Sequence, residues 1–244
     1  MGAGAEIKVG CCGFPISRKK YYKEFKVVEV QKTFYKPPKV ETALKWRGEA
    51  PEDFEFTVKA WMVFTHDPKS PIWRKSGMPR DNDYGLLKPT ERNLDEWSRF
   101  LKIVEALKAK FVVFQSPPSF KATKENVRNA TDFFSSIRED VELIGWEVRH
   151  ESWRDHLREL LRGLDLVHVV DPLYEDPLWG KVFYFRLHGR REGNKIVYNH
   201  KYSEKEMEGI LRAVEKQEKP GYVMFNNGVF MRESALDLIR RLQT

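Results

Sequence analysis

The sequence predicts an α/β fold in which eight parallel strands close into a barrel wrapped by helices, as one domain over residues 1–244. Two observations predict this fold. Eight short apolar runs recur along the whole chain, and amphipathic helical patterns lie between most of them. This alternation is typical of a parallel sheet covered by helices, and eight strands in a chain of this length favour closure. An open doubly wound sheet is the alternative, because periodicity does not reveal closure.

The eight apolar runs are predicted to be buried strands. Each run is short, rich in β-branched and aromatic residues, and bounded by glycine, proline or charged residues. The runs cover residues 7–13, 27–31, 54–60, 111–115, 143–149, 166–171, 182–189 and 221–227.

Helices are predicted where apolar residues recur at helical spacing between these runs. In the segment 93–110, for example, Leu94 and Trp97 begin one apolar stripe. Ser203 followed by Glu206 forms a capping box at the start of another helix. The remaining predicted helical segments are 124–140, 153–164, 203–217 and 232–242.

Two segments interrupt the alternation. Residues 172–181, "PLYEDPLWGK", are too few and too rich in proline for a full helix, so one βα unit of the barrel is predicted to be shortened. Residues 67–92 form a long loop, and loops of that length inside a compact domain are usually functional or mobile.

The composition allows several kinds of partner and does not select among them. The net charge is +7 and the pI about 9.2, which suits anionic partners such as phosphorylated ligands or nucleic acid. The adjacent Cys11 and Cys12 predict a reduced, cytoplasmic protein, since neighbouring thiols do not staple a loop. No apolar run is long enough to span a membrane, and no signal peptide is predicted. Abundant lysine and glutamate indicate a thermophile.

Polar and ionic side chains end seven of the eight apolar runs. A charge after a single strand is usually only the first solvated loop residue. In a closed parallel barrel, however, the carboxyl ends of all strands meet at one mouth, where active sites form. The repetition of polar residues at these strand ends therefore predicts a functional site at the mouth of the barrel. The residues at these ends are Glu29, Gln31, Lys59, Gln115, Glu147, Arg149, Asp171, Arg186, His188, Asn226 and Asn227.

Several motifs follow one another in the order seen in one family: "VGCCGF", "VVEVQKTFYKPP", "FEFTVKAWMVFTH", "FVVFQSPPSF", "WEVRHESW", "VVDP", "YFRLHG" and "VMFNN". The chain resembles the domain of unknown function 72 family, also called YecE-like, from about residue 7 to about residue 238. The resemblance implies a TIM-barrel-like fold and no established reaction. The family's motif positions match Glu29, Tyr35, Lys59, His66, Gln115, Glu147, Arg149, Trp153, Asp171, Arg186, His188, Asn226 and Asn227.

Two positions depart from the family pattern. Phe14 stands where a tryptophan is common, and Ser234 with Ala235 stands where an Asn-Ala pair is common. Both departures weaken the transfer of family features to the rim of the site.

Glu147, Asp171, His66 and His188 are residue types that bind metals. The resemblance also implies a likeness to xylose-isomerase-like barrels such as endonuclease IV, which use a metal cluster. Lys59, Arg149 and Arg186 would share this mouth, however. A divalent ion about 5 Å from one such cation is repelled by roughly 6 kcal/mol at an effective dielectric constant of about 20. The sequence therefore predicts neither a resident metal nor a cofactor.

The same cations favour an anion. Arg149 and Arg186 are predicted to bind a phosphate, because guanidinium groups grip phosphate oxygens in pairs. Glu147 is a candidate general base, His188 a candidate proton shuttle, and Asp171 a further acid–base candidate. The alternative is a salt-bridge network that only plugs the barrel mouth, although buried networks are a poor route to stability.

Two functions are consistent with this site. One is a hydrolase or phosphodiester-acting enzyme with a phosphorylated or nucleic-acid substrate. The other is a nucleic-acid or nucleotide binding module without catalysis. The loop 67–92 interleaves basic residues with Trp73 and Tyr84, a pattern that suits single-stranded nucleic acid and equally suits a solvated loop.

Overall fold

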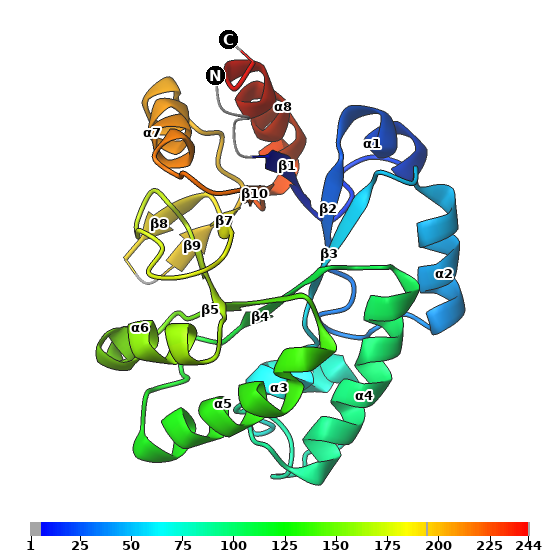
Figure 1. Ribbon diagram of the computed structural model, residues 1–244, viewed down its shortest axis with the longest axis vertical. Helices are drawn as coiled ribbons and strands as arrows, with labels where there is room; N and C mark the ends of the chain where they lie inside the picture. The colour runs from blue at the N-terminus through cyan, green and yellow to red at the C-terminus, as the bar shows by residue number, and fades with distance from the viewer. Residues whose placement is uncertain (1–5, 194, 244) are drawn as a thin grey trace.

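The computed structural model describes residues 6–193 and 195–243, and it shows a closed barrel of eight parallel strands (Figure 1). Around the barrel the strands lie in the order β1, β10, β7, β6, β5, β4, β3, β2. The fold predicted from the sequence is therefore confirmed, and the open sheet is excluded. The strands are β1 (Ile7–Cys12), β2 (Val27–Val30), β3 (Glu55–Lys59), β4 (Phe111–Gln115), β5 (Leu143–Glu147), β6 (Val167–Val170), β7 (Phe183–Leu187) and β10 (Gly221–Phe225).

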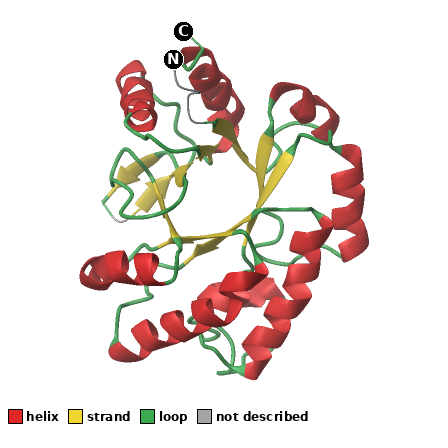
Figure 2. Cartoon of the chain, viewed as in Figure 1, coloured by secondary structure: helices red, strands yellow, loops and turns green. Residues whose placement is uncertain are grey.

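Helices surround the barrel on its outside (Figure 2). Thr90 and Thr123 cap the two longest helices, α4 and α5, and the predicted Ser203–Glu206 capping box begins α7. The helices are α1 (Arg18–Glu24), α2 (Val40–Glu49), α3 (Met62–Thr65), α4 (Glu91–Ala106), α5 (Lys124–Ile137), α6 (Arg154–Gly163), α7 (Glu204–Glu215) and α8 (Met231–Arg241).

The shortened βα unit lies where the sequence predicts it, because no helix separates β6 from β7. The predicted loop 67–92 contains one 3-10 helix, Pro71–Ser76. Helices α1, α2 and the four-residue α3 escape the sequence pattern. Helices α1 and α2 each bury only two side chains, so their apolar stripes are short. A hairpin of β8 (Arg190–Glu192) and β9 (Lys195–Val197) is also missed, since no buried side chain marks either strand.

Strand alternation divides the barrel interior into an apolar floor and a polar mouth. Phe111, Tyr184 and Tyr222 lie inside the barrel and pack their rings together, with 4.5 Å between the Phe111 and Tyr184 ring centroids. Arg186 lies two residues after Tyr184 in β7, on the same side of the strand. Gly145 makes room for the floor, because a Cβ at that position would lie 2.5 Å from the Phe111 ring.

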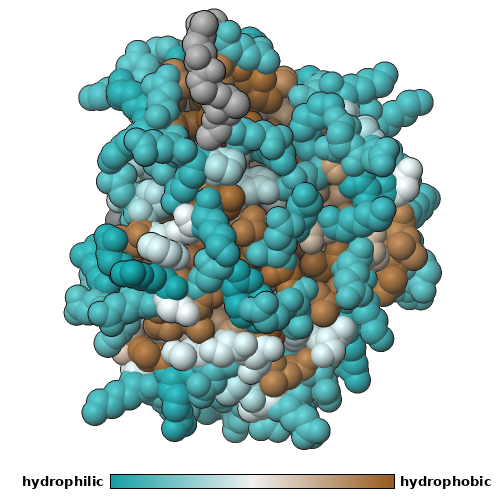
Figure 3. Space-filling view, in the orientation of Figure 1, coloured by the Kyte–Doolittle hydropathy of each residue, from teal (hydrophilic) through white to brown (hydrophobic). Residues whose placement is uncertain are grey.

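The surface is mainly hydrophilic. In the face seen in Figure 3, hydrophilic residues cover most of the area, and hydrophobic ones show only between them. Among the described residues, no helix is both long enough and apolar enough to cross a membrane.

Candidate functional site

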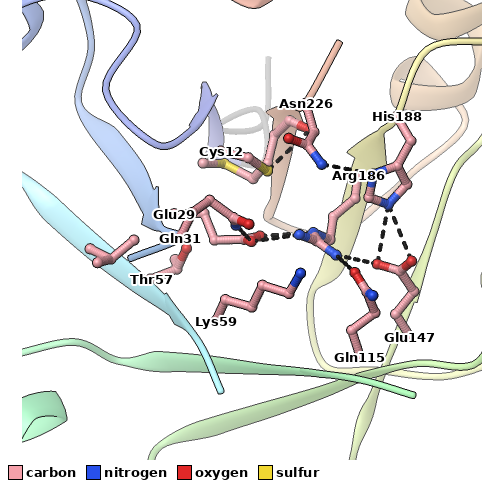
Figure 4. Close-up of polar contacts among 12 residues, drawn as sticks. Cys12, Glu29, Gln31, Thr57, Lys59, Gln115, Glu147, Arg186, His188 and Asn226 are labelled. Atoms are coloured by element: carbon pink, nitrogen blue, oxygen red, sulfur yellow. Dashed lines mark hydrogen bonds and ion pairs between the residues drawn. The ribbon is translucent and has the colours of Figure 1, made fainter. Parts of the chain in front are cut away.

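A fully buried arginine, Arg186, organises the polar mouth of the barrel. Its Nε and Nη2 donate to the two oxygens of Glu29 at 3.0 and 2.8 Å. Its Nη1 donates to Gln115 Oε1 at 3.0 Å and to the Glu147 carboxylate. Figure 4 shows Arg186 between Glu29 on one side and Gln115 and Glu147 on the other. The Tyr184 hydroxyl adds a hydrogen bond of 2.8 Å to Glu29, so the network rests on the aromatic floor.

Glu147 is held by three partners. Arg149 Nε donates to Glu147 Oε1 at 2.8 Å, and His188 Nε2 lies 3.2 Å from both carboxylate oxygens. The third partner is Arg186. Burial opposes ionisation of Glu147, but the nearby Arg149, His188 and Arg186 outweigh it and hold its pKa well below the usual range. A carboxylate so strongly held is a weak base in this arrangement, and the role of general base stays a prediction from the sequence.

His188 is neutral and has no free ring nitrogen. Burial lowers its pKa to about 4, although Glu147 favours the charged form. Its Nδ1 accepts from Asn226 Nδ2 at 3.0 Å, so Nε2 carries the proton and faces Glu147. Both nitrogens therefore have partners, and in this arrangement His188 orients the carboxylate; its role as a proton shuttle stays a prediction.

Asp171 is the carboxyl group whose ionisation is most easily changed. It follows β6 and accepts two long backbone hydrogen bonds, from the amides of His188 at 3.3 Å and Leu173 at 3.2 Å. Burial raises the pKa of Asp171 to about 7, against the effect of these two amides. No guanidinium or ammonium group forms an ion pair with it among the described residues. Asp171 is thus poised to take up or release a proton near neutral pH.

Lys59 reaches into the centre of the mouth from the end of β3 (Figure 4). Its Nζ lies 3.7 Å from the centre of the Phe34 ring, and it makes no hydrogen bond or ion pair with any described residue. Burial, together with the Arg186 guanidinium, lowers the pKa of Lys59 to about 7. The His66 ring contacts the same phenylalanine, with 5.4 Å between the centroids of the His66 and Phe34 rings.

A cavity of about 820 Å³ opens beside the network, at the ends of β5, β6 and β7. Glu147, Arg149, Asp171 and His188 line its inner wall, and the β8–β9 hairpin forms part of the opposite wall. Three further cations face the cavity and form no ion pair with any residue that the structure describes. They are Arg154, Arg191 and Lys195.

Most of the residues predicted from the sequence meet at this mouth. Glu29, Lys59, Gln115, Glu147, Arg149, Arg186, His188 and Asn226 belong to the network or contact it. Tyr35 lies outside it: its side chain is exposed, and its ring contacts Lys75.

Two predicted substrate-binding residues have structural roles. Trp153 is fully buried, packs on Phe120, and donates from its indole nitrogen to the Phe120 carbonyl at 2.7 Å. Asn227 is also fully buried, and its amide donates to the His200 carbonyl and to Ser234 Oγ. Their side-chain donors are used within the protein, where they hold the loops that surround the mouth, while Asn227 Oδ1 has no hydrogen-bond partner among the described residues. Substrate binding by Trp153 and Asn227 stays a prediction.

The sequence also missed residues of the site. Tyr184 could have been found, because it lies two residues before Arg186 and strand alternation places both inside the barrel. Arg154 begins a helix and resembles any solvated charge. Arg191 and Lys195 lie on the hairpin, which carries no buried pattern, so nothing in the sequence connects them with the mouth.

The donors at this mouth do not suit a metal ion. Glu29 and Glu147, the two carboxylates at the centre, are both bound by Arg186. Within residues 6–193 and 195–243, no group of three or more His, Cys, Asp or Glu side chains could hold an ion. A cation placed here would also face the Arg186 and Arg149 guanidiniums.

We accordingly expect the purified protein to carry no stoichiometric transition metal. The reason is that a metal would have to displace guanidiniums from both central carboxylates. Elemental analysis of protein purified without chelators would check this, with the buffer as the blank. One or more tightly held zinc or manganese ions per chain would contradict it.

Comparisons with known proteins agree with the fold and the motifs. UPF0759 protein YunF of Bacillus subtilis is 25% identical over 239 residues, which cover 85% of this chain and 79% of that protein. A DUF72 family protein of Enterococcus faecalis has a similar structure, with a TM-score of 0.73, 23% identity and 98% of each chain covered.

A wider likeness concerns the fold alone. The xylose isomerase domain protein of Planctomyces limnophilus aligns with a TM-score of 0.60 at 13% identity, covering 99% of this chain and 98% of that one. Its barrel is thus of the same type. Residues 17–244 match the family described as protein of unknown function DUF72. Since this match covers nearly the whole chain, the protein belongs to the DUF72 family, the one that its motifs resemble.

Proposed function

We propose that the cavity at the ends of β5, β6 and β7 binds a phosphorylated small molecule. The observation that carries this proposal is the set of cations on its wall. Arg154, Arg191 and Lys195 face the cavity without an ion pair among the described residues, and Arg149 lines it as well. A phosphate dianion gains Coulomb energy from each of them, and arginine also offers paired N–H donors.

Four carboxylates also line the cavity. Glu151 is exposed to solvent, and the other three, Glu147, Asp171 and Glu175, offset the attraction only in part. Glu147 is already neutralised by Arg149 and Arg186. Burial raises the pKa of Asp171 to about 7 and raises that of Glu175. The cavity therefore becomes more positive as the pH falls towards about 6, and an anion is favoured over a cation.

The proposed reaction is hydrolysis of a phosphate ester, with Asp171 as the acid–base group. In its ionised form Asp171 accepts a proton from the attacking water, while guanidiniums stabilise the charge on the phosphoryl oxygens. We assign this role to Asp171 and not to Glu147, because the pKa of Asp171 lies near neutral pH.

The alternative of a nucleic-acid binding module receives less support. Its sequence evidence was the pair Trp73 and Tyr84 in the loop 67–92. Both side chains are buried, Trp73 completely, and their rings pack towards each other at 6.2 Å. They offer no face on which a base could stack. A steep salt dependence of ligand binding would favour nucleic acid nonetheless, since it reports many phosphate contacts.

We expect Asp171→Asn to lower the hydrolysis rate by about 10²–10⁴-fold, the range of a general acid–base group. Affinity for inorganic phosphate should change little, because asparagine keeps the shape of the side chain. In the wild type the rate should rise with pH through about 7, as Asp171 ionises. The substrates would be 4-nitrophenyl phosphate and bis(4-nitrophenyl) phosphate, and calorimetry would measure phosphate binding.

Asp176→Asn is the matched control, because Asp176 is exposed and pairs with Lys216 on the surface. Wild-type protein that binds phosphate but turns over neither ester would contradict the hydrolase assignment. Wild-type protein that does not bind phosphate would contradict the binding site itself.

A further inference from the structure

We propose that Lys59 is a nucleophilic amine that forms an imine with an aldehyde or ketone carrying an anionic group. The anionic group rests on the proposed function: Lys59 does not itself line that cavity, but Arg149 lines it and also acts electrostatically on Lys59. The nucleophile rests on separate observations about Lys59 itself.

The first observation is that Lys59 is buried against the Phe34 ring and has no carboxylate partner among the described residues. Only 6% of the residue is exposed, yet its Nζ makes no hydrogen bond or ion pair within the described part of the chain. The central carboxylates, Glu29 and Glu147, are both occupied by Arg186. Figure 4 shows the Lys59 amine pointing from β3 towards Arg186 and Gln115. The side chain is thus aimed into the mouth without being neutralised there.

A second lysine of the same barrel provides the contrast. Lys8, in β1, places its Nζ 2.7 Å from Glu55 Oε2 and also contacts Glu6. Those carboxylates help to raise the pKa of Lys8 against the effect of burial. A lysine with a purely structural role would be expected to have such a partner, and Lys59 has none.

The surroundings of Lys59 favour the neutral amine. Six charged or titratable groups interact electrostatically with Lys59, and they come from five elements or the segments that follow them. They are Cys12, Glu29, His66, Glu147, Arg149 and Arg186. His66 is neutral, since burial lowers its pKa to about 4. Burial and Arg186 lower the pKa of Lys59 to about 7. A lysine that is desolvated beside another cation is an activated nucleophile at neutral pH.

The chemistry balances without a further reactant. The lone pair of the neutral Lys59 amine attacks the carbonyl carbon, and the C–N bond forms as the C=O π bond opens. The two hydrogens of the amine leave with the carbonyl oxygen as one water molecule. The product is a C=N double bond between Nζ and the former carbonyl carbon. No oxidant or reductant takes part in this step.

Reductive trapping tests the proposal. The protein would be treated with glyoxylate and cyanoborohydride near pH 7, and modified lysines would be located by peptide mass spectrometry. Lys59 should be modified about tenfold or more faster than exposed lysines, because at neutral pH its free-amine fraction is on the order of 10³ times larger, an advantage that burial partly offsets. Modification should rise with pH around about 7. Propanal, an aldehyde without charge, would serve as the second probe.

Lys59→Met is the control variant, since it removes the amine together with its buried charge and keeps a similar side-chain length. It should lose the fast modification and retain its fold. Modification spread over exposed lysines, with Lys59 unmodified in the wild type, would overturn the proposal. If propanal and glyoxylate modify Lys59 equally fast, the result supports Lys59 as a nucleophile. The same result contradicts the anion-binding site, and with it the proposed function.

Discussion

Replacing Arg186 with methionine should lower the free energy of unfolding by about 3–5 kcal/mol, the usual cost of removing one partner of a buried ion pair. The cost is high because Arg186 serves two buried carboxylates at once. Among the described residues, the Glu29 side chain would keep Tyr184 and Gln31 as partners, and that of Glu147 would keep Arg149 and His188. Urea denaturation at pH 7 would measure the effect.

The effect of Arg186→Met should also depend on pH in a defined direction. The folded-state pKa of Glu147 lies well below 4.5, its ordinary value. Such a group stabilises the protein above the unfolded-state pKa, and this contribution is lost as the pH falls through the folded-state pKa. The difference in unfolding free energy between wild type and variant should therefore shrink in acid, below about pH 4.5.

Two further variants make the Arg186 experiment specific. Arg212→Met removes an exposed arginine that pairs with Glu208 within α7, and exposed pairs contribute little, so its stability should hardly change. Adding Glu29→Gln and Glu147→Gln to Arg186→Met should restore part of the lost stability, because no unpaired carboxylate is then buried. An Arg186→Met protein as stable as the wild type would show that the network is not the structural support described above.

The sequence was sufficient for the barrel because strand periodicity survives in a single chain. Every predicted strand exists, and each ends within about three residues of its prediction. Alternation also places Glu147 and Arg149 on the same side of their strand, where they form an ion pair. These successes share a cause: each depends on neighbours in sequence.

The properties that the sequence did not predict depend on neighbours in space. Nothing near Glu147 in the chain reveals Arg186, which makes this carboxylate a poor base. Nothing near Asp171 shows that it lacks a cationic partner and keeps a pKa of about 7. Trp153 lies within the motif "WEVRHESW", yet its partner Phe120 comes from a different loop. The contacts that distinguish Asp171 from Glu147 as a proton acceptor are therefore contacts in space.

Arg149→Ala should weaken the binding of inorganic phosphate by about 1.5–3 kcal/mol, the range of a hydrogen bond to a charged group. This corresponds to roughly 10–150-fold in the dissociation constant. Arg149 is suited to this role because its side chain lines the cavity and remains 18% exposed, whereas Arg186 is sealed beneath it. Calorimetric titration with phosphate at low salt would measure the change.

The stability of the Arg149→Ala protein decides between a binding site and a structural plug. Arg149 contacts Glu147 and Gln115 in a largely buried network. Glu147 still keeps Arg186 and His188, so we expect a loss of about 1 kcal/mol, well below that for Arg186→Met. Arg149→Lys should recover part of the affinity, since it restores the charge without the paired donors. If Arg149→Ala instead unfolds readily while the folded fraction binds phosphate as tightly as the wild type, the charges of the mouth only hold the barrel together, and the phosphate site must be abandoned.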